Sequence, residues 1–158
     1  YLSDLNLDDT IFQFVDSGKP FVGICLGLQL LFDSSDEFGA NSGLGLVKGK
    51  VKKFKFHSRN SIKYPVPQIG WNMIKQTNGS WNDTLLCNND NGDFMYFVHS
   101  YYVEPQKKNI IVSSTTYGNT EYCSSVQHDN IFACQFHPEK SGDVGLNIYK
   151  NLKKGFSS

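Results

Sequence analysis

The most constraining feature of this sequence is a cysteine between two glycines, where a strand pattern gives way to a helix pattern. Residues 23–27 read Gly-Ile-Cys-Leu-Gly, after an apolar run that begins at Phe21 and before a leucine-rich run that ends at Phe32. The first run is typical of a buried strand and the second of a helix. This is the pattern of a nucleophile elbow, with Cys in place of Ser. It predicts an α/β fold in which Cys25 projects from the end of a sheet.

The position of Cys25 in this turn predicts its chemistry. Glycines at 23 and 27 let neighbouring backbone pass close to a strained turn without a clash. A helix that starts after the turn lowers the pKa of the thiol, and the Leu26 N–H points to where an oxyanion would form. We therefore predict that Cys25 is a nucleophile. The alternative is a buried structural cysteine, which is the usual state of a free Cys in an apolar segment.

A thiol nucleophile needs a base, and the best candidate is His137. It follows the apolar run 131–136 and begins the tripeptide His-Pro-Glu, in which Glu139 can accept a hydrogen bond from the ring and orient it. The proline between them stiffens the segment. Taken alone, a histidine at a strand end is more often a satisfied polar group, so the assignment depends on the pairing with Cys25.

The other three histidines are weaker candidates. His57 lies in a polar stretch and His128 in a turn pattern, so both are predicted to be solvated. His99 ends the apolar run 94–98 and is predicted to lie on the wall of the site. The Cys and His residues lack paired ligand spacing, so we expect neither a metal nor another cofactor.

The rest of the chain predicts one domain over residues 1–158. Helical spacing predicts helices over 4–16 and 143–152. Between them, turn clusters separate β-like segments at 44–56, 69–74, 94–98, 110–116, 122–127 and 131–136. A chain of 158 residues with 39% hydrophobic content can bury one core but has little room for a second.

Composition narrows the class of protein. Fifteen Lys and Arg balance fifteen Asp and Glu, so a polyanionic partner such as a nucleic acid is not expected. The four cysteines have irregular spacing, which favours free thiols in a reducing cytosol. No stretch approaches the roughly 20 apolar residues that cross a bilayer, and no secretory signal begins the sequence. We therefore expect a soluble cytoplasmic protein.

Together these motifs resemble the class I (triad-type) glutamine amidotransferases. That family combines the elbow around Cys25 with a glutamine one helical turn later, here Gln29, and a distant His-Pro-Glu. The resemblance implies a flavodoxin-like, three-layer domain with a central mixed sheet and additional antiparallel strands. It also implies glutamine hydrolysis through a thioester on Cys25, with His137 and Glu139 completing the triad. The residues implied in glutamine binding are Leu26, Gly27 and Gln29 along the pocket, and Ser100 and Tyr101 at the amino-acid end.

Longer blocks narrow this resemblance to the glutaminase subunits of imidazole glycerol phosphate synthase. The matching blocks are residues 23–32, 43–46, 70–72, 96–105 and 135–142. They imply a heterodimer with a synthase (cyclase) subunit that has a (β/α)₈ barrel and uses the ammonia to form imidazole glycerol phosphate and AICAR in histidine biosynthesis. Trp71, Tyr96 and Lys140 match positions that face this partner. On their own, the two aromatics read equally as core residues and the lysine as a solvated charge.

Departures from the family leave alternatives open. The family usually has a histidine before Gly-Trp-Asn, whereas this sequence has Gln68 in that stretch. Its opening strand-helix-strand segment, with a glycine-rich oxyanion strand, has no counterpart here, so we expect an N-terminally truncated domain. Related subunits supply ammonia for amidation of surface-polysaccharide sugars. A γ-glutamyl peptidase on the same scaffold and a catalytically silent, partner-binding fragment are the other interpretations.

Overall fold

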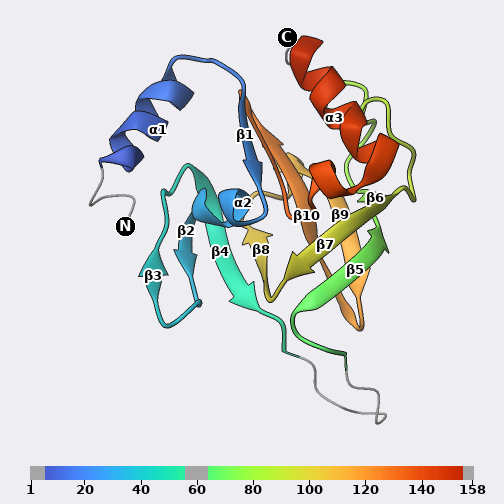
Figure 1. Ribbon diagram of the computed structural model, residues 1–158. Helices are drawn as coiled ribbons and strands as arrows, with labels where there is room; N and C mark the ends of the chain where they lie inside the picture. Colours follow the sequence, from blue (N-terminus) through green and yellow to red (C-terminus); the bar gives the residue numbers. More distant parts are fainter. Residues whose placement is uncertain (1–5, 56–63, 155–158) are drawn as a thin grey trace.

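The computed structural model describes residues 6–55 and 64–154, which form a mixed β-sheet flanked by helices (Figure 1). His57 lies outside the described residues. In chain order the elements are α1 (Leu7–Asp16), β1 (Phe21–Ile24), α2 (Leu26–Leu30), β2 (Phe32–Ser35), β3 (Asn41–Ser42), β4 (Val47–Lys53), β5 (Gln68–Met73), β6 (Lys75–Gln76), β7 (Phe94–His99), β8 (Tyr101–Pro105), η2 (Lys108–Ile110), β9 (Ile111–Tyr117), β10 (Thr120–His128), β11 (Ile131–Cys134), η3 (Pro138–Lys140) and α3 (Gly142–Lys154).

The described residues form a nine-stranded sheet and a separate two-stranded one. The main sheet has the order β1-β11-β10-β8-β4-β2-β3, and β9 pairs with β10 and β6 outside this path. Strands β1 and β11 are parallel, as are β2 and β4, whereas β10 is antiparallel to each of its neighbours. Strands β5 and β7 form the separate antiparallel pair. The predicted mixed sheet with additional antiparallel strands is confirmed.

The pairing of β1 with β11 positions the site. Ile24 lies opposite Cys134 in a parallel register, so both strands end at the same edge of the sheet. Alternate residues of β11 enter different core clusters: Ile131 and Ala133 join one, and Phe132 and Cys134 join the other. Both faces of β11 are therefore buried, which explains its unbroken apolar sequence.

The helix after the elbow is shorter than predicted. The leucine-rich run predicts a helix through Phe32, but α2 ends at Leu30 and Phe32 begins β2. Phe32 pairs with Val47 and is completely buried in the core. Pairing with a strand fifteen residues away thus outweighs the local helical pattern.

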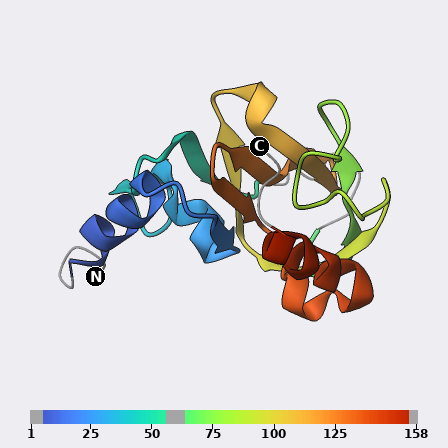
Figure 2. The same cartoon turned by 90° about the horizontal axis from the view of Figure 1, so that it is seen from above.

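The two amphipathic helices lie at opposite ends of the molecule (Figures 1 and 2). Helix α1 ends just before Gly18, which has a φ of 72° and is the predicted stop. No residue of α1 is buried, whereas α3 buries Gly145, Ile148 and Asn151. None of the helices in the described part of the chain is long and apolar enough to cross a membrane.

Candidate active site

Cys25 occupies a strained turn between β1 and α2. Its φ of 52° and ψ of −105° are unusual for a residue with a side chain. A Cβ added at Gly23 would lie 2.9 Å from the backbone carbon and oxygen of Gly27, so the turn requires glycine at 23. A Cβ at Gly27 would meet nothing within 4 Å. The close contact predicted for both glycines is therefore between the position of a side chain at 23 and the backbone of 27. A side chain at 27 would not be in this contact.

The thiol of Cys25 is half-buried among polar groups. It donates to the Val98 carbonyl at 3.8 Å and accepts from Gln135 Nε2 at 3.6 Å. Burial raises the pKa of Cys25, while the Leu26 N–H and the Gln135 amide lower it. The predicted lowering by a helix N-terminus is outweighed, because α2 has only five residues and the thiol is partly removed from water. The resting group is a thiol.

His137 has one nitrogen oriented by a carboxylate and the other unpaired. Its Nδ1 lies 2.7 Å from Glu139 Oε1. A carboxylate only accepts, so Nδ1 carries the proton and Nε2 presents its lone pair. Within the described part of the chain, Nε2 is buried and has no hydrogen-bond partner. The backbone N–H donates to Tyr96 O at 2.8 Å, and the Ser141 hydroxyl donates to His137 O at 2.6 Å. This arrangement would allow His137 to act as a general base.

Cys25 and His137 lie at the same edge of the sheet. The Cys25 N–H donates to Cys134 O at 2.8 Å, and His137 follows three residues after Cys134. Among the described residues, no hydrogen bond joins the sulfur to His137 Nε2. For a proton to pass from Cys25 to the imidazole, the thiol would first have to turn away from Val98.

A cavity of about 300 Å³ opens beside the elbow. It is lined by Leu26, Gln29, Leu30, Ser35, Glu37, Phe38, Asn41, Ser42 and Gly43. Two of the five predicted glutamine-binding residues, Leu26 and Gln29, are among these. Glu37 adds a carboxylate that sequence reasoning missed. The available signal was an acidic pair, Asp36 and Glu37, in the loop after β2.

Gln29 also contacts the segment that contains the predicted Ser100 and Tyr101. Its Nε2 lies 3.0 Å from Tyr101 O and 3.0 Å from Gln135 Oε1. Both Ser100 and Tyr101 are half-buried, and neither lines the cavity beside the elbow. The structure thus brings the backbone of Tyr101 to Gln29.

His99 is buried in the core, rather than on the wall of the site where we expected it. Its Nδ1 is 2.7 Å from Tyr101 O and its Nε2 is 3.2 Å from the Tyr122 hydroxyl. Burial lowers its pKa to about 4, so the ring is neutral. The predicted solvated His128 is partly exposed, with Nδ1 3.6 Å from Asp129 Oδ2.

The three residues predicted to face a partner lie together. The Trp71 and Tyr96 rings have centroids 6.0 Å apart, and Lys140 Nζ is 6.0 Å from the Tyr96 centroid. Trp71 and Tyr96 are directly opposite each other on β5 and β7. Because Tyr96 O binds the His137 N–H, this cluster adjoins the proposed base.

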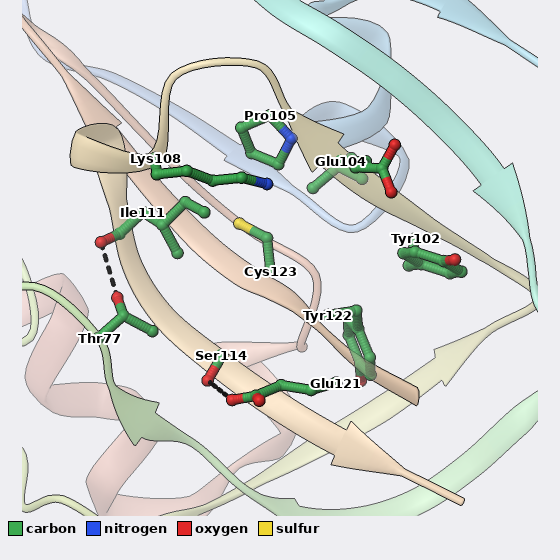
Figure 3. A pocket seen from close by; sticks show the side chains of 11 residues that line it. Thr77, Tyr102, Glu104, Pro105, Lys108, Ile111, Ser114, Glu121, Tyr122 and Cys123 are labelled. Carbon is green, nitrogen blue, oxygen red and sulfur yellow. Dashed lines mark hydrogen bonds between the residues drawn. The ribbon is translucent and has the colours of Figure 1, made fainter. Parts of the chain in front are cut away.

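A second cavity, of about 350 Å³, contains another thiol (Figure 3). Its lining includes Cys123, Lys108, Glu104 and Glu121 but none of the predicted catalytic residues. Burial raises the pKa of Cys123 to about 12, so this thiol is not ionised near neutral pH. Across residues 6–55 and 64–154, no three His, Cys, Asp or Glu side chains are grouped to hold a metal ion.

Comparison with known proteins gives consistent matches over most of the chain. The family model "Glutamine amidotransferase class-I" matches residues 6–152. Imidazole glycerol phosphate synthase subunit HisH of Syntrophotalea carbinolica is 44% identical over 145 residues, which are 91% of this chain and 68% of that protein. The same subunit of Gloeobacter violaceus is 44% identical over 96% of this chain and 64% of its own length. That of Pyrococcus furiosus is 43% identical over 94% and 71%. The chain thus spans about two thirds of the length of these relatives.

Solved structures match at much lower identity. PurLQS from Thermotoga maritima has a TM-score of 0.62 at 17% identity, covering 94% of this chain and 67% of that one. A glutamine amidotransferase from the same organism has a TM-score of 0.60 at 15% identity, covering 98% and 55%. At such identities these structures bear on the fold alone.

Proposed function

The chain belongs to the class I glutamine amidotransferase family, and from that premise we propose that it hydrolyses glutamine to glutamate and ammonia through a thioester on Cys25. The observation that carries this proposal is the unpaired Nε2 of His137, at the sheet edge where Cys25 also lies. Its relatives that are 43–44% identical are named as subunits of imidazole glycerol phosphate synthase. These relatives support the proposal that this chain hydrolyses glutamine.

The reaction begins with proton transfer from the Cys25 thiol to His137 Nε2. The sulfur attacks the side-chain amide carbon of glutamine, and the imidazolium returns the proton to the departing nitrogen, which leaves as ammonia. Water then attacks the γ-glutamyl thioester while Nε2 accepts its proton, and the released thiolate takes that proton back. Glu139 stabilises the imidazolium formed in each half-reaction. The Leu26 N–H is proposed to stabilise the oxyanion.

The cavity beside the elbow suits the substrate. Free glutamine has a neutral side chain and, at its other end, an ammonium and a carboxylate. We assign Glu37 to the ammonium, because its carboxylate lines the same cavity as Leu26 and Gln29. The assignment of Ser100 and Tyr101 to the amino-acid end, and of Gly27 to the pocket, remains part of this proposal.

A partner-docking face is proposed on β5 and β7. Ile69, Trp71, Met73 and Phe94 expose 62%, 54%, 41% and 51% of their surface. Alternate residues of a strand share a face, and Trp71 and Met73 lie opposite Tyr96 and Phe94, so these side chains form one apolar stripe. Stripes of this kind mark interaction sites.

We assign this stripe, with Lys140, to a synthase (cyclase) subunit that has a (β/α)₈ barrel and forms a heterodimer with this protein. The partner would use the ammonia to form imidazole glycerol phosphate and AICAR in histidine biosynthesis. Docking beside His137 would shield ammonia from protonation in bulk water. The four cysteines are free, which fits a cytoplasmic site for this reaction.

The test is glutamate release from glutamine by the purified protein with its cyclase partner. Cys25→Ala is expected to abolish release, whereas Cys87→Ala, which changes another half-buried thiol, is the matched control. Full activity of Cys25→Ala would rule out the proposed function. Trp71→Ala should weaken the complex with the partner, measured by calorimetry, without unfolding the protein.

A further inference from the structure

A fully buried glutamine, Gln135, contacts the sulfur of Cys25. It directly follows β11, and its backbone N–H donates to Ser124 O at 2.8 Å, which holds it in place. Its side-chain Nε2 lies 3.6 Å from the Cys25 sulfur. The triad mechanism leaves this contact without a role.

Backbone chemistry determines which end of the Gln135 amide faces the sulfur. The Tyr101 carbonyl can only accept, so the Gln29 atom 3.0 Å away is its NH₂ group. That same nitrogen is 3.0 Å from Gln135, and it must meet an oxygen there. The NH₂ of Gln135 is therefore directed at Cys25, because flipping the amide would place two donors against each other.

The Tyr101 carbonyl that sets this order is itself anchored. His99 is neutral and buried, and its Nδ1 lies 2.7 Å from the same oxygen, so Nδ1 carries the proton. The Tyr122 hydroxyl is 3.2 Å from the other ring nitrogen and fixes the ring. A continuous series of hydrogen bonds thus runs from His99 through Tyr101, Gln29 and Gln135 to the sulfur.

Sulfur becomes negative when Cys25 is deprotonated, in a place partly removed from water. The Val98 carbonyl, which accepts the S–H bond of the resting thiol, can only repel the thiolate. Glu139 also opposes a negative charge on Cys25. Two N–H donors favour it, the backbone of Leu26 and the amide of Gln135, and the positive charge of Lys140 favours it to a smaller extent. A hydrogen bond to a charged group is strong enough to change the amount of thiolate about tenfold.

We propose that Gln135 is a further catalytic residue whose amide N–H donates to the Cys25 sulfur and stabilises the thiolate, in an orientation enforced by Gln29 and the Tyr101 carbonyl. The proposal rests on the proposed function, in which Cys25 is the nucleophile.

The test is the rate of Cys25 alkylation by iodoacetamide as a function of pH, with labelling of the Cys25 peptide followed by mass spectrometry. Gln135→Leu keeps a similar volume and removes the donor. Its titration midpoint is expected to move to higher pH, so that alkylation near neutral pH slows about tenfold while the alkaline plateau is unchanged. A purely structural role would change the plateau or the melting temperature instead. The matched control is Gln127→Leu. Gln127 lies on β10, next to β11, and this change removes an amide that donates to Asp83 O.

A second variant covers the case in which Gln135→Leu fails to fold. Gln135→Glu preserves the shape and the acceptor for Gln29 but places a carboxylate oxygen against the sulfur, so the midpoint should rise at least as far. An unchanged midpoint in either folded variant overturns the proposal. Alkylation needs no glutamine turnover, so that result would leave the proposed function intact, and glutaminase activity without Cys25 would overturn both.

Discussion

His99 ends strand β7, and His137 follows strand β11 by three residues. The surroundings of these two histidines differ. After β7, the chain turns directly into β8, so the Tyr101 carbonyl folds back onto His99 and the ring is enclosed. After β11, Pro138 begins a short 3-10 helix that brings Glu139 against Nδ1 of His137. The His99 ring has both nitrogens hydrogen-bonded to neutral groups, whereas the His137 ring has a carboxylate at one nitrogen and, within residues 6–55 and 64–154, no partner at the other.

This difference separates a structural histidine from the proposed proton carrier. Burial keeps His99 neutral, with a pKa of about 4, so it cannot accept a proton near neutral pH without losing its place in the core. His137 is the proposed proton carrier, because its Nε2 has no partner among the described residues and the Glu139 carboxylate lies beside its Nδ1. A histidine at a strand end is therefore not a candidate base by its position alone, and the features that single out His137 are a carboxylate at one nitrogen and no partner for the other among the described residues.

The largest effect is expected at His137. His137→Asn removes the proton carrier, so glutamate release should fall about 10³-fold, equivalent to about 4 kcal/mol of transition-state stabilisation. Steady-state assays with the cyclase partner measure it. His128→Asn is the control, because His128 is partly exposed and outside the site. An equal loss of activity in both variants would mean that His137 is not the base.

Acid should lower the stability of the folded protein, because His99 is buried in its neutral form. Its pKa is lowered from 6.5 to about 4, so the unfolded chain binds a proton that the folded protein refuses. The stability from this source is complete above the unfolded pKa and is lost as the pH falls from about 6.5 to about 4, by on the order of 3 kcal/mol. Urea unfolding at several pH values measures the slope. His99→Phe should be less steep over this range, and an identical slope would contradict a neutral, buried ring.

Glu139 should matter less than His137. Glu139→Gln keeps a group beside Nδ1 but removes the charge that stabilises the imidazolium. Removing the carboxylate from a buried triad costs about 10⁴-fold. The Glu139 side chain is 44% exposed, so water can take over part of its role, and we expect a loss of about 10²-fold. The pH dependence of kcat/KM provides the measurement, and undiminished activity would show that the carboxylate does not orient the ring.

The smallest effect on turnover is expected at His99. His99→Phe should lower the free energy of unfolding by about 2 kcal/mol, because two buried hydrogen bonds are lost. Activity should stay within about tenfold of the unmodified protein, since the Gln29 bond to Tyr101 O remains. Denaturation and glutamate release on the same samples separate the two outcomes. A stable but inactive variant would reverse the roles assigned to the two strand ends.

Local patterns in the sequence were sufficient for the elbow, the β11 strand and the His-Pro-Glu motif, because each is encoded within a few residues. Pattern could not show that Phe32 leaves the helix, since its partner Val47 lies in another element. Nor could it show the hydrogen bonds from Gln29 to Tyr101 or from Gln135 to Cys25, which join residues 72 and 110 positions apart. The prediction of a lowered pKa for Cys25 was wrong for the same reason, because burial, which raises this pKa, is set by distant segments.

The most direct test of the account is covalent labelling with a chloroketone analogue of glutamine, followed by peptide mass spectrometry. We expect an adduct on Cys25 that forms within about tenfold of the unmodified rate in His99→Phe and far more slowly in His137→Asn. An adduct on Cys87 would contradict the role of Cys25 as nucleophile. Labelling of Cys25 that is equally fast in His137→Asn would contradict the role of His137 as base.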